Sequence, residues 1–230
     1  MPSSQFDFDQ LMADIKNSPD YVKENLACYF YHNTHACNYC TKRDTCPSRE
    51  PRKGDKGRFC VYPGSFDPFT FGHLDIVKRA LKLFDGITIL VCINSSKETR
   101  LITCTDTVSV IRKTIMELLP PEDSTRVKVD FLKLGSSVLD YMSNHRNELN
   151  HCMNIIRGVR NSADAEYEIN LCGQYEYFSH NIKFEFIPLI ASPEYRFLSS
   201  SIVREAWKIG CLNEVAPMVP EQIEEALYNN

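Results

Sequence analysis

No stretch of this 230-residue sequence approaches the ~18 uninterrupted apolar residues that a membrane-spanning helix needs. The first residues, MPSSQFDFDQLMADIKNSPD, carry acidic side chains where a secretory signal peptide would have a basic start and an apolar centre. We therefore expect a cytoplasmic protein with no membrane partner.

The sequence also lacks a large excess of charge of one sign, since its net charge is −4. So small a surplus gives no reason to expect nucleic acid as the main partner. Internal repeats and low-complexity segments are absent from the sequence as well. A hydrophobic content of 43% and a charged content of 24% are ordinary for a globular protein, and the length suits one α/β domain with a small extra module.

Cysteine is abundant, with ten residues, and disulfides are not expected to explain them in a cytoplasmic protein. Six are spread along the chain, and we interpret them as small buried hydrophobic residues. The remaining four lie in one short segment: Cys28, Cys37, Cys40 and Cys46.

A Cys-x2-Cys pair can bind one metal ion from a tight turn, and two further ligands complete a tetrahedron. We predict a structural Zn²⁺ bound by Cys28, Cys37, Cys40 and Cys46, with His32 or His35 as a substitute ligand. An iron–sulfur cluster is an alternative, as is a set of free thiols. A metal is favoured because so short a segment cannot build a hydrophobic core without such a staple.

A polar linker, PSREPRKGDKGR at residues 47–58, holds two prolines, two glycines and no apolar anchor. We predict that it divides the chain into a Cys-rich extension with linker, residues 1–58, and a main domain, residues 59–230.

From Phe59 onward, short apolar runs alternate with segments of helical periodicity. The pattern predicts strands at residues 59–62, 87–93, 127–132, 153–156 and 183–190. It predicts helices at residues 73–84, 105–119, 138–150, 164–178 and 201–209. Alternating strands and helices indicate a parallel sheet covered on both faces. We therefore predict a doubly wound, Rossmann-like α/β fold with a five-stranded parallel sheet, whose ligand lies at the carboxyl ends of the strands.

The segment YPGSFDPFTFGHLD, residues 62–75, connects the first strand to the first helix. A helix N-terminus attracts phosphate through its unpaired N–H groups and its partial positive charge. We expect Gly64 to let the backbone approach a ligand, Gly72 to open the helix without a side chain in the way, and His73 to point at the phosphates. By itself this loop indicates a phosphate-binding site, and a capping or packing role for His73 is the alternative.

The string YPGSFDPFTFGHLDIVKRA resembles the T/H-x-G-H signature of the nucleotidyltransferase superfamily, in the form found in bacterial-type phosphopantetheine adenylyltransferases. Two further motifs of that family follow in the same order: IRGVR with DAEYE at residues 156–168, and YRFLSSSIVRE at residues 195–205. The resemblance covers roughly residues 60–230, and three ordered motifs are more specific than any one of them.

The resemblance implies transfer of the adenylyl group of ATP to 4′-phosphopantetheine, giving dephospho-coenzyme A and pyrophosphate in coenzyme A biosynthesis. The catalytic residues that it implies are His73, Lys97 and Arg157. It assigns ATP binding to Ser65, Phe66, His73, Gly158, Val159, Arg160, Glu168, Tyr195, Arg196, Phe197, Leu198, Ser199, Ser200 and Ser201. It assigns binding of the acceptor substrate to Ser65, Lys97, Ser137 and Arg157.

The chemistry agrees with these assignments, because joining two polyanions requires cations and helix N-termini more than a nucleophile of the protein. Mg²⁺ is expected with the ATP phosphates, and the resemblance implies a homo-oligomer, typically a hexamer. Taken singly, Lys97 is equally well a solvated loop residue, Glu168 the partner of an arginine, and Ser199–Ser201 a helix cap.

The chain departs from the family pattern between Lys97 and Arg157, where it is longer, and at Gly135-Ser-Ser-Val138, where Gly-Leu-Leu-Val is usual. These serines make the wall of the acceptor site more polar. Two other hypotheses stay open. One is an adenylyl- or cytidylyltransferase of the same superfamily acting on nicotinamide mononucleotide, flavin or an alditol phosphate. The other is a non-catalytic module that binds a nucleotide or coenzyme A.

Overall fold

The computed structural model describes residues 57–93, 100–149, 151–179 and 182–229, and everything that follows concerns these residues. The predicted metal ligands Cys28, Cys37, Cys40 and Cys46 lie outside the described residues, as does Lys97. The division of the chain near residue 58 therefore stays a prediction.

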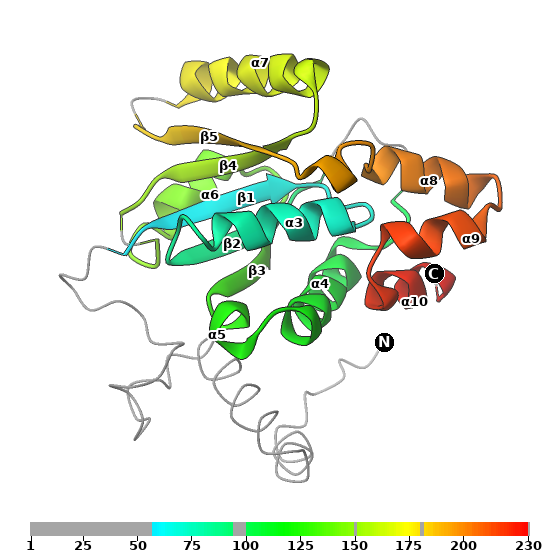
Figure 1. Ribbon diagram of the computed structural model, residues 1–230. Coiled ribbons are helices and arrows are strands. Elements are labelled where there is room, and N and C mark those ends of the chain that lie inside the picture. The colour runs from blue at the N-terminus through cyan, green and yellow to red at the C-terminus, as the bar shows by residue number, and fades with distance from the viewer. Residues whose placement is uncertain (1–56, 94–99, 150, 180–181, 230) are drawn as a thin grey trace, which may run out of the picture. The chain divides into compact units, whose positions relative to one another are not determined.

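A five-stranded parallel sheet forms the centre of the domain, as the alternation of strands and helices predicted (Figure 1). Its strands are β1 (Phe59–Gly64), β2 (Gly86–Val91), β3 (Val127–Phe131), β4 (Asn154–Val159) and β5 (Glu185–Ile190). Their order across the sheet is β3-β2-β1-β4-β5. The chain moves outward from β1 through β2 to β3 and then returns to the other side of β1. The switch point, where such folds bind ligands, therefore lies between β1 and β4.

Helices cover both faces of the sheet. They are α3 (Phe71–Ala80), α4 (Cys104–Leu118), α5 (Pro121–Ser124), α6 (Val138–Asn144), α7 (Ser162–Phe178), α8 (Ser200–Lys208), α9 (Leu212–Val215) and α10 (Glu221–Tyr228). Two short 3-10 turns, η2 (Pro193–Tyr195) and η3 (Ala216–Met218), complete the elements.

Alternate residues of each strand supply two separate hydrophobic cores. Cys60 and Tyr62 of β1 pack in the core beneath α3, α4 and the C-terminal helices. Val61, between them, packs in the opposite core with residues of α6, and Tyr175 of α7 borders that core. This is the two-faced burial that a parallel sheet requires.

Several helix boundaries differ from the prediction, such as the end of α3 at Ala80 and the start of α7 at Ser162, and two differences have identifiable reasons. Helix α3 begins at Phe71, two residues earlier than expected, because the side chain of Thr70 caps it. Helix α6 ends at Asn144 rather than at residue 150. The apolar Leu149 beyond it is still buried, so the periodicity continues into turns that are not helical. Along the described part of the chain, no helix has the length and apolar character to cross a membrane.

Candidate active site

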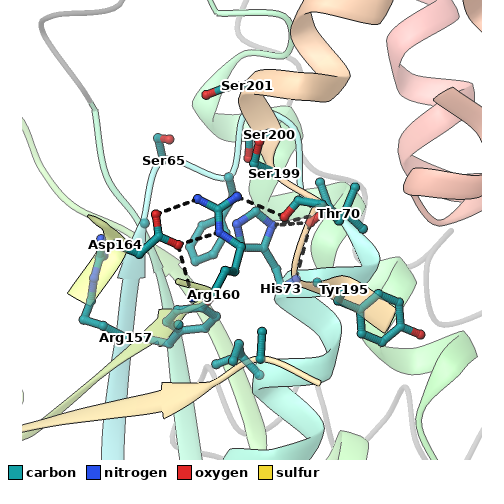
Figure 2. Close-up of a pocket in the computed structure, with 18 of the residues that line it drawn as sticks. Ser65, Thr70, His73, Arg157, Arg160, Asp164, Tyr195, Ser199, Ser200 and Ser201 are labelled. Carbon is teal, nitrogen blue, oxygen red and sulfur yellow. Dashed lines mark hydrogen bonds and ion pairs between the residues drawn. The ribbon is translucent and has the colours of Figure 1, made fainter. Parts of the chain in front are cut away.

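A cavity of about 270 Å³ opens at the switch point, between the ends of β1 and β4 (Figure 2). Its walls come from the β1–α3 loop, the first turn of α3, the end of β4 with the start of α7, and the first turn of α8. The structure brings these predicted site residues together there: Ser65, Phe66, His73, Arg157, Gly158, Arg160, Glu168, Tyr195, Leu198, Ser199, Ser200 and Ser201.

Four predicted residues of the described part do not line this cavity. Val159 is buried in the domain interior, and Phe197 is 87% exposed beside Arg196. Ser137 caps α6, where its hydroxyl accepts the N–H of Asp140 at 3.1 Å. Three of these four, Val159, Arg196 and Phe197, were expected to bind ATP, and Ser137 was expected to bind the acceptor.

His73 is held by a reciprocal cap at the start of α3. Its backbone N–H donates to the Thr70 hydroxyl at 3.4 Å, and its Nδ1 accepts the backbone N–H of Thr70 at 3.0 Å. Because Nδ1 accepts a hydrogen bond, the proton of the neutral ring lies on Nε2. The ring packs against Phe66 in a T-shaped arrangement and against Phe69 at a tilt of 31°, with ring centroids 5.1 Å and 5.4 Å away. The capping alternative for His73 is thus correct, and the cap also fixes the ring as an Nε2–H donor in the wall of the cavity.

Arg157 is fixed by a carboxylate behind it. Its Nε and Nη2 donate to the two carboxylate oxygens of Glu168, both at 2.8 Å, and Nη1 donates to the carbonyl oxygen of Pro63. Burial disfavours the charge of Arg157, but its hydrogen bonds to Glu168 and the negative charge of that carboxylate outweigh this cost, and the pKa of Arg157 is raised. These contacts do not use all the N–H groups of a guanidinium. Arg157 is therefore a permanent, oriented cation that can still donate to a ligand.

Arg160 has a similar arrangement with Asp164. Its Nε and Nη2 donate to the Asp164 carboxylate at 2.6 Å and 3.0 Å, and Nη1 donates to the carbonyl oxygen of Leu198 at 3.1 Å. The last contact joins the end of β4 to the chain that leads into α8. Arg160 thus holds two walls of the cavity together.

Two helices begin at the cavity, α3 after Thr70 and α8 after Ser199. Ser199 caps α8 by accepting the N–H of Ile202 at 3.2 Å, as the serine cluster predicted. Ser200 donates its hydroxyl to the carbonyl oxygen of Pro68 at 2.9 Å. Two helix N-termini therefore converge on one cavity, and their partial positive charges favour an anion there.

Thr70, Asp164 and Tyr167 also line the cavity but were not among the predicted site residues. Two of them have a sequence signal. Thr70 stands three residues before His73, the spacing of a capping box. Asp164 stands four residues after Arg160, the spacing of an ion pair at the start of a helix.

Comparison with known proteins agrees with this geometry. A family model described as cytidylyltransferase-like matches residues 61–206. A phosphopantetheine adenylyltransferase of Thermodesulfovibrio yellowstonii is 37% identical over 171 residues, which cover 74% of this chain and 94% of that relative. One from Geobacter sulfurreducens is 34% identical over 171 residues, covering 74% and 93%. The chain belongs to the phosphopantetheine adenylyltransferase family.

Solved structures of more distant proteins share the fold. Plasmodium falciparum nicotinic acid mononucleotide adenylyltransferase complexed with NaAD gives a TM-score of 0.55 at 14% identity, covering 75% of this chain and 95% of that one. A putative nicotinate-nucleotide adenylyltransferase from Vibrio parahaemolyticus gives 0.52 at 13% identity, covering 75% and 93%. At these identities the likeness extends to the fold alone, so the sequence relatives define the adenylyltransferase family to which this chain belongs.

Of the two glycines singled out in the sequence of this phosphopantetheine adenylyltransferase, Gly64 is required for a different reason from the one that the sequence suggested. A Cβ at Gly64 would lie 2.8 Å from Cζ of Phe66, so the Phe66 ring, which folds back over the strand end, requires glycine there. A Cβ at Gly72 would meet only ordinary contacts, the nearest being Thr70 Oγ1 at 3.5 Å. The protein itself therefore has room for a side chain at Gly72, and the glycine serves the cavity that it lines.

We predict that Gly72→Ala leaves the free energy of unfolding unchanged or raises it slightly, because alanine has the higher helix propensity. The matched change Gly158→Ala should lower it by about 1–3 kcal/mol, since its Cβ would lie 3.1 Å from Ile76 Cγ1 and overpack the interface between β4 and α3. Urea unfolding of both variants measures this difference. A Gly72→Ala protein as unstable as Gly158→Ala would show that packing, not the cavity, requires glycine at residue 72.

Proposed function

We propose that this chain transfers the adenylyl group of ATP to 4′-phosphopantetheine, giving dephospho-coenzyme A and pyrophosphate in coenzyme A biosynthesis. One observation carries the proposal: the cavity gathers two helix N-termini, the Nε2–H of His73 and the oriented cation Arg157. A phosphate oxygen of the acceptor attacks the α-phosphorus in line, the bond to the bridging oxygen breaks, and pyrophosphate leaves. The protein need supply no nucleophile, only position and charge.

On the nucleotide side, His73 and the N-terminus of α3 would donate to the phosphates around the reacting phosphorus. The N-terminus of α8 would bind the leaving phosphates through its backbone N–H groups, including that of Ser200, and through the hydroxyls of Ser199 and Ser201, because the Ser200 hydroxyl already donates to Pro68. These donors are fixed by contacts within the protein before any ligand arrives. Donors that need not reorganise give the largest stabilisation of a developing charge.

On the acceptor side, we assign the phosphate of phosphopantetheine to Arg157 and Ser65, together with Lys97. Glu168 fixes Arg157 and is not itself a phosphate ligand, because both its oxygens accept from that guanidinium. The more polar chain at Gly135-Ser-Ser-Val138 would face the pantetheine arm, with Ser137 as the cap of α6.

Mg²⁺ fits this site as an ion that arrives with ATP. Within the described ranges, no group of three or more His, Cys, Asp and Glu residues could hold a metal. The carboxylates of Asp164 and Glu168, which line the cavity, are already bound to arginines. Magnesium binds phosphate oxygens and water readily and needs no protein cage. When bound, it would neutralise charge on the phosphates, and the protein's own donors would align them.

We expect the full chain to release pyrophosphate from ATP with 4′-phosphopantetheine as acceptor. Nicotinamide mononucleotide, an acceptor of the alternative enzyme hypothesis, should give no turnover above background. Equal turnover with both acceptors, or turnover with the second alone, would contradict the proposal. The assay also separates an enzyme from a module that binds ATP without reacting.

Variants of His73 distinguish its two roles in that assay. An asparagine can accept the Thr70 N–H in place of Nδ1 but has no donor where Nε2 lies. We therefore expect both His73→Ala and His73→Asn to lower kcat by about 10²–10³-fold, as loss of one preorganised donor does. Only His73→Ala should also lower the stability, by roughly 1 kcal/mol, because it removes half of the cap. A His73→Asn protein with wild-type kcat would show that the histidine only caps the helix.

For the Cys-rich extension, residues 1–58, we propose a structural zinc bound by Cys28, Cys37, Cys40 and Cys46. The purified protein should contain about one equivalent of zinc per chain by elemental analysis, and Cys37→Ser/Cys40→Ser should lose it. Cys211→Ser, at an exposed cysteine of the main domain, is the control and should retain the metal. Iron in place of zinc would support the cluster alternative, and the absence of both metals would refute the site.

We also propose that the chain forms a homo-oligomer, with a hexamer as the form that the family implies, and that it works in the cytoplasm. Helix α7 supports an interface. Among its 17 residues, the structure buries Glu168, while Tyr167, Ile169, Tyr177 and Phe178 are 62–82% exposed. Tyr167 and Ile169 are two positions apart, about 200° around the helix, so apolar side chains lie on more than one side of it. An oligomer interface along α7 would remove these exposed apolar side chains from water.

Light scattering should give a mass several times the 26.5 kDa of one chain, and six times that mass for a hexamer. Ile169→Glu should reduce the mass by placing a charge in the apolar interface. Leu83→Glu, at an exposed apolar residue outside α7, should leave it unchanged. A monomeric wild-type protein would contradict the proposal.

A further inference from the structure

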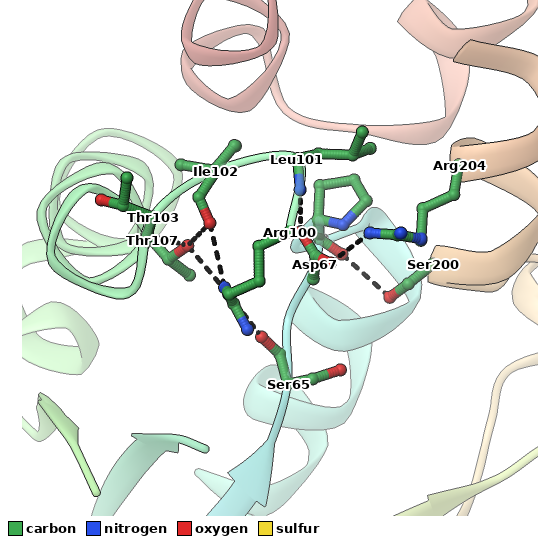
Figure 3. A network of polar contacts seen from close by, with 10 residues as sticks. Ser65, Asp67, Arg100, Leu101, Ile102, Thr103, Thr107, Ser200 and Arg204 are labelled. Carbon is green, nitrogen blue, oxygen red and sulfur yellow. Dashed lines mark hydrogen bonds and ion pairs between the residues drawn. The ribbon is translucent and has the colours of Figure 1, made fainter. Parts of the chain in front are cut away.

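One buried carboxylate next to the cavity joins three segments that are far apart in the sequence. Asp67 lies in the β1–α3 loop, and its side chain is 0% exposed. One carboxylate oxygen accepts the backbone N–H of Leu101 at 2.8 Å, and the other accepts from the guanidinium of Arg204 on α8 (Figure 3). Asp67 therefore ties its own loop both to the chain before α4 and to α8.

Two neighbouring contacts join the same three segments. Arg100 donates to the carbonyl oxygen of Ser65 at 2.9 Å, and Ser200 donates to the carbonyl oxygen of Pro68 at 2.9 Å. Ser65 and Ser200 line the cavity, whereas Asp67 stands directly behind them in the loop. The network is thus built around the cavity, not at a distant point of the fold.

A buried ion pair contributes little net stability, because the cost of removing both charges from water offsets their attraction. The Asp67–Arg204 pair is such a case, with side chains 0% and 12% exposed. Apolar side chains of similar volume would stabilise this position as well or better. A charged hydrogen bond supplies what apolar contact lacks, which is a directed geometry.

The two segments that Asp67 joins lie next to residues proposed for different substrates. Arg100 and Leu101 follow Lys97, a predicted acceptor-side residue, within a few positions of the sequence. Arg204 lies in the helix whose first turn carries Ser199, Ser200 and Ser201 on the nucleotide side. The separation of the two half-sites therefore depends on what joins these segments.

We propose that Asp67 is a positioning residue for the adenylyl transfer proposed above, on which this inference rests. Through Leu101 and Arg204 it holds the acceptor side and the nucleotide side at one fixed separation. In-line attack requires the reacting atoms in a near-attack geometry, and a misplacement of about 1 Å can cost about a hundredfold in rate. Asp67 acts through its neighbours, so its loss should change the rate more than the binding of either substrate.

The double variant Asp67→Asn/Arg204→Met separates positioning from stability, since it leaves no buried charge without a partner. We expect it to fold with a Tm close to that of the wild type and to lose about ten- to a hundredfold in kcat, while KM for both substrates changes by less than about threefold. The single variant Arg204→Lys, which keeps a positive charge beside Asp67, should recover most of the kcat that the double variant loses. The matched control is Lys113→Met/Glu225→Gln, which removes an exposed ion pair between α4 and α10 and should leave kcat unchanged.

The proposal is overturned if the folded double variant keeps kcat within about twofold of the wild type, or if its loss of activity only follows a loss of folded protein. Amide hydrogen exchange on the ligand-free protein tests the coupling without turnover. Exchange in the first turn of α8 should be at least about tenfold faster in the double variant and unchanged in the control. The Leu101 N–H should exchange as in the wild type, because the side-chain oxygen of the introduced asparagine can still accept it. Unchanged exchange in the first turn of α8 overturns the positioning role. A wild-type protein that releases no pyrophosphate would instead refute the proposed function, and the exchange result would still decide the role of Asp67.

Discussion

Two arginines at the end of β4 keep their positions because carboxylates from α7 bind them from behind. Glu168 binds Arg157, and Asp164 binds Arg160, each through two charged hydrogen bonds. A cavity for polyanions needs positive charge. In water, however, an unpaired arginine has no fixed side-chain orientation, and its attraction to an anion is weak. Pairing removes part of the net charge but fixes the geometry, so the remaining N–H groups and the helix N-termini face the ligand without reorganisation. The helices and strands around the cavity are arranged so that these two pairs can form.

The backbone at the N-termini of α3 and α8 also contributes positive charge to the cavity. Both α3 and α8 begin at the cavity, and each start is defined by a side-chain cap, Thr70 with His73 for α3 and Ser199 for α8. The caps satisfy some of the unpaired N–H groups of each first turn and leave the helix end oriented toward the cavity. Because the histidine takes part in the cap through Nδ1, its position depends on the helix itself rather than on a flexible side chain. The His73 ring and the starts of α3 and α8 are therefore positioned by contacts within the protein.

Much of the fold could be predicted because the spacing of apolar residues in the sequence differs between strands and helices. The strands at residues 59–62 and 127–132 alternate or run apolar in short blocks, and the structure has β1 and β3 there. Sites in motifs, such as His73 and the serines before α8, could be located because each motif marks a strand end or a helix start. The error at α6, which ends at Asn144, arose because Leu149 is buried in a turn, and burial alone cannot distinguish a turn from another helical turn. Thr70 was missed as a lining residue because its sequence position indicates a helix cap, and a capping residue can also line the cavity.

The contacts that assemble the site could not be predicted, since they join residues with no periodic relation. Arg160 meets the carbonyl oxygen of Leu198, and Asp67 meets the N–H of Leu101, across separations of 38 and 34 residues. No local pattern marks a carbonyl oxygen or a backbone N–H as a partner. In the proposed site, the donors for the nucleotide are mainly helix ends that the sheet positions. Of the residues proposed for the acceptor, Lys97 follows β2 and Ser137 follows β3 in the sequence, in connections that can change without disturbing a strand. One departure from the family pattern, the serines at Gly135-Ser-Ser-Val138, follows β3, and the other, the longer chain, lies between Lys97 and Arg157. A directed contact such as that between Asp67 and Leu101 would keep the variable side aligned with the fixed one while its loops changed.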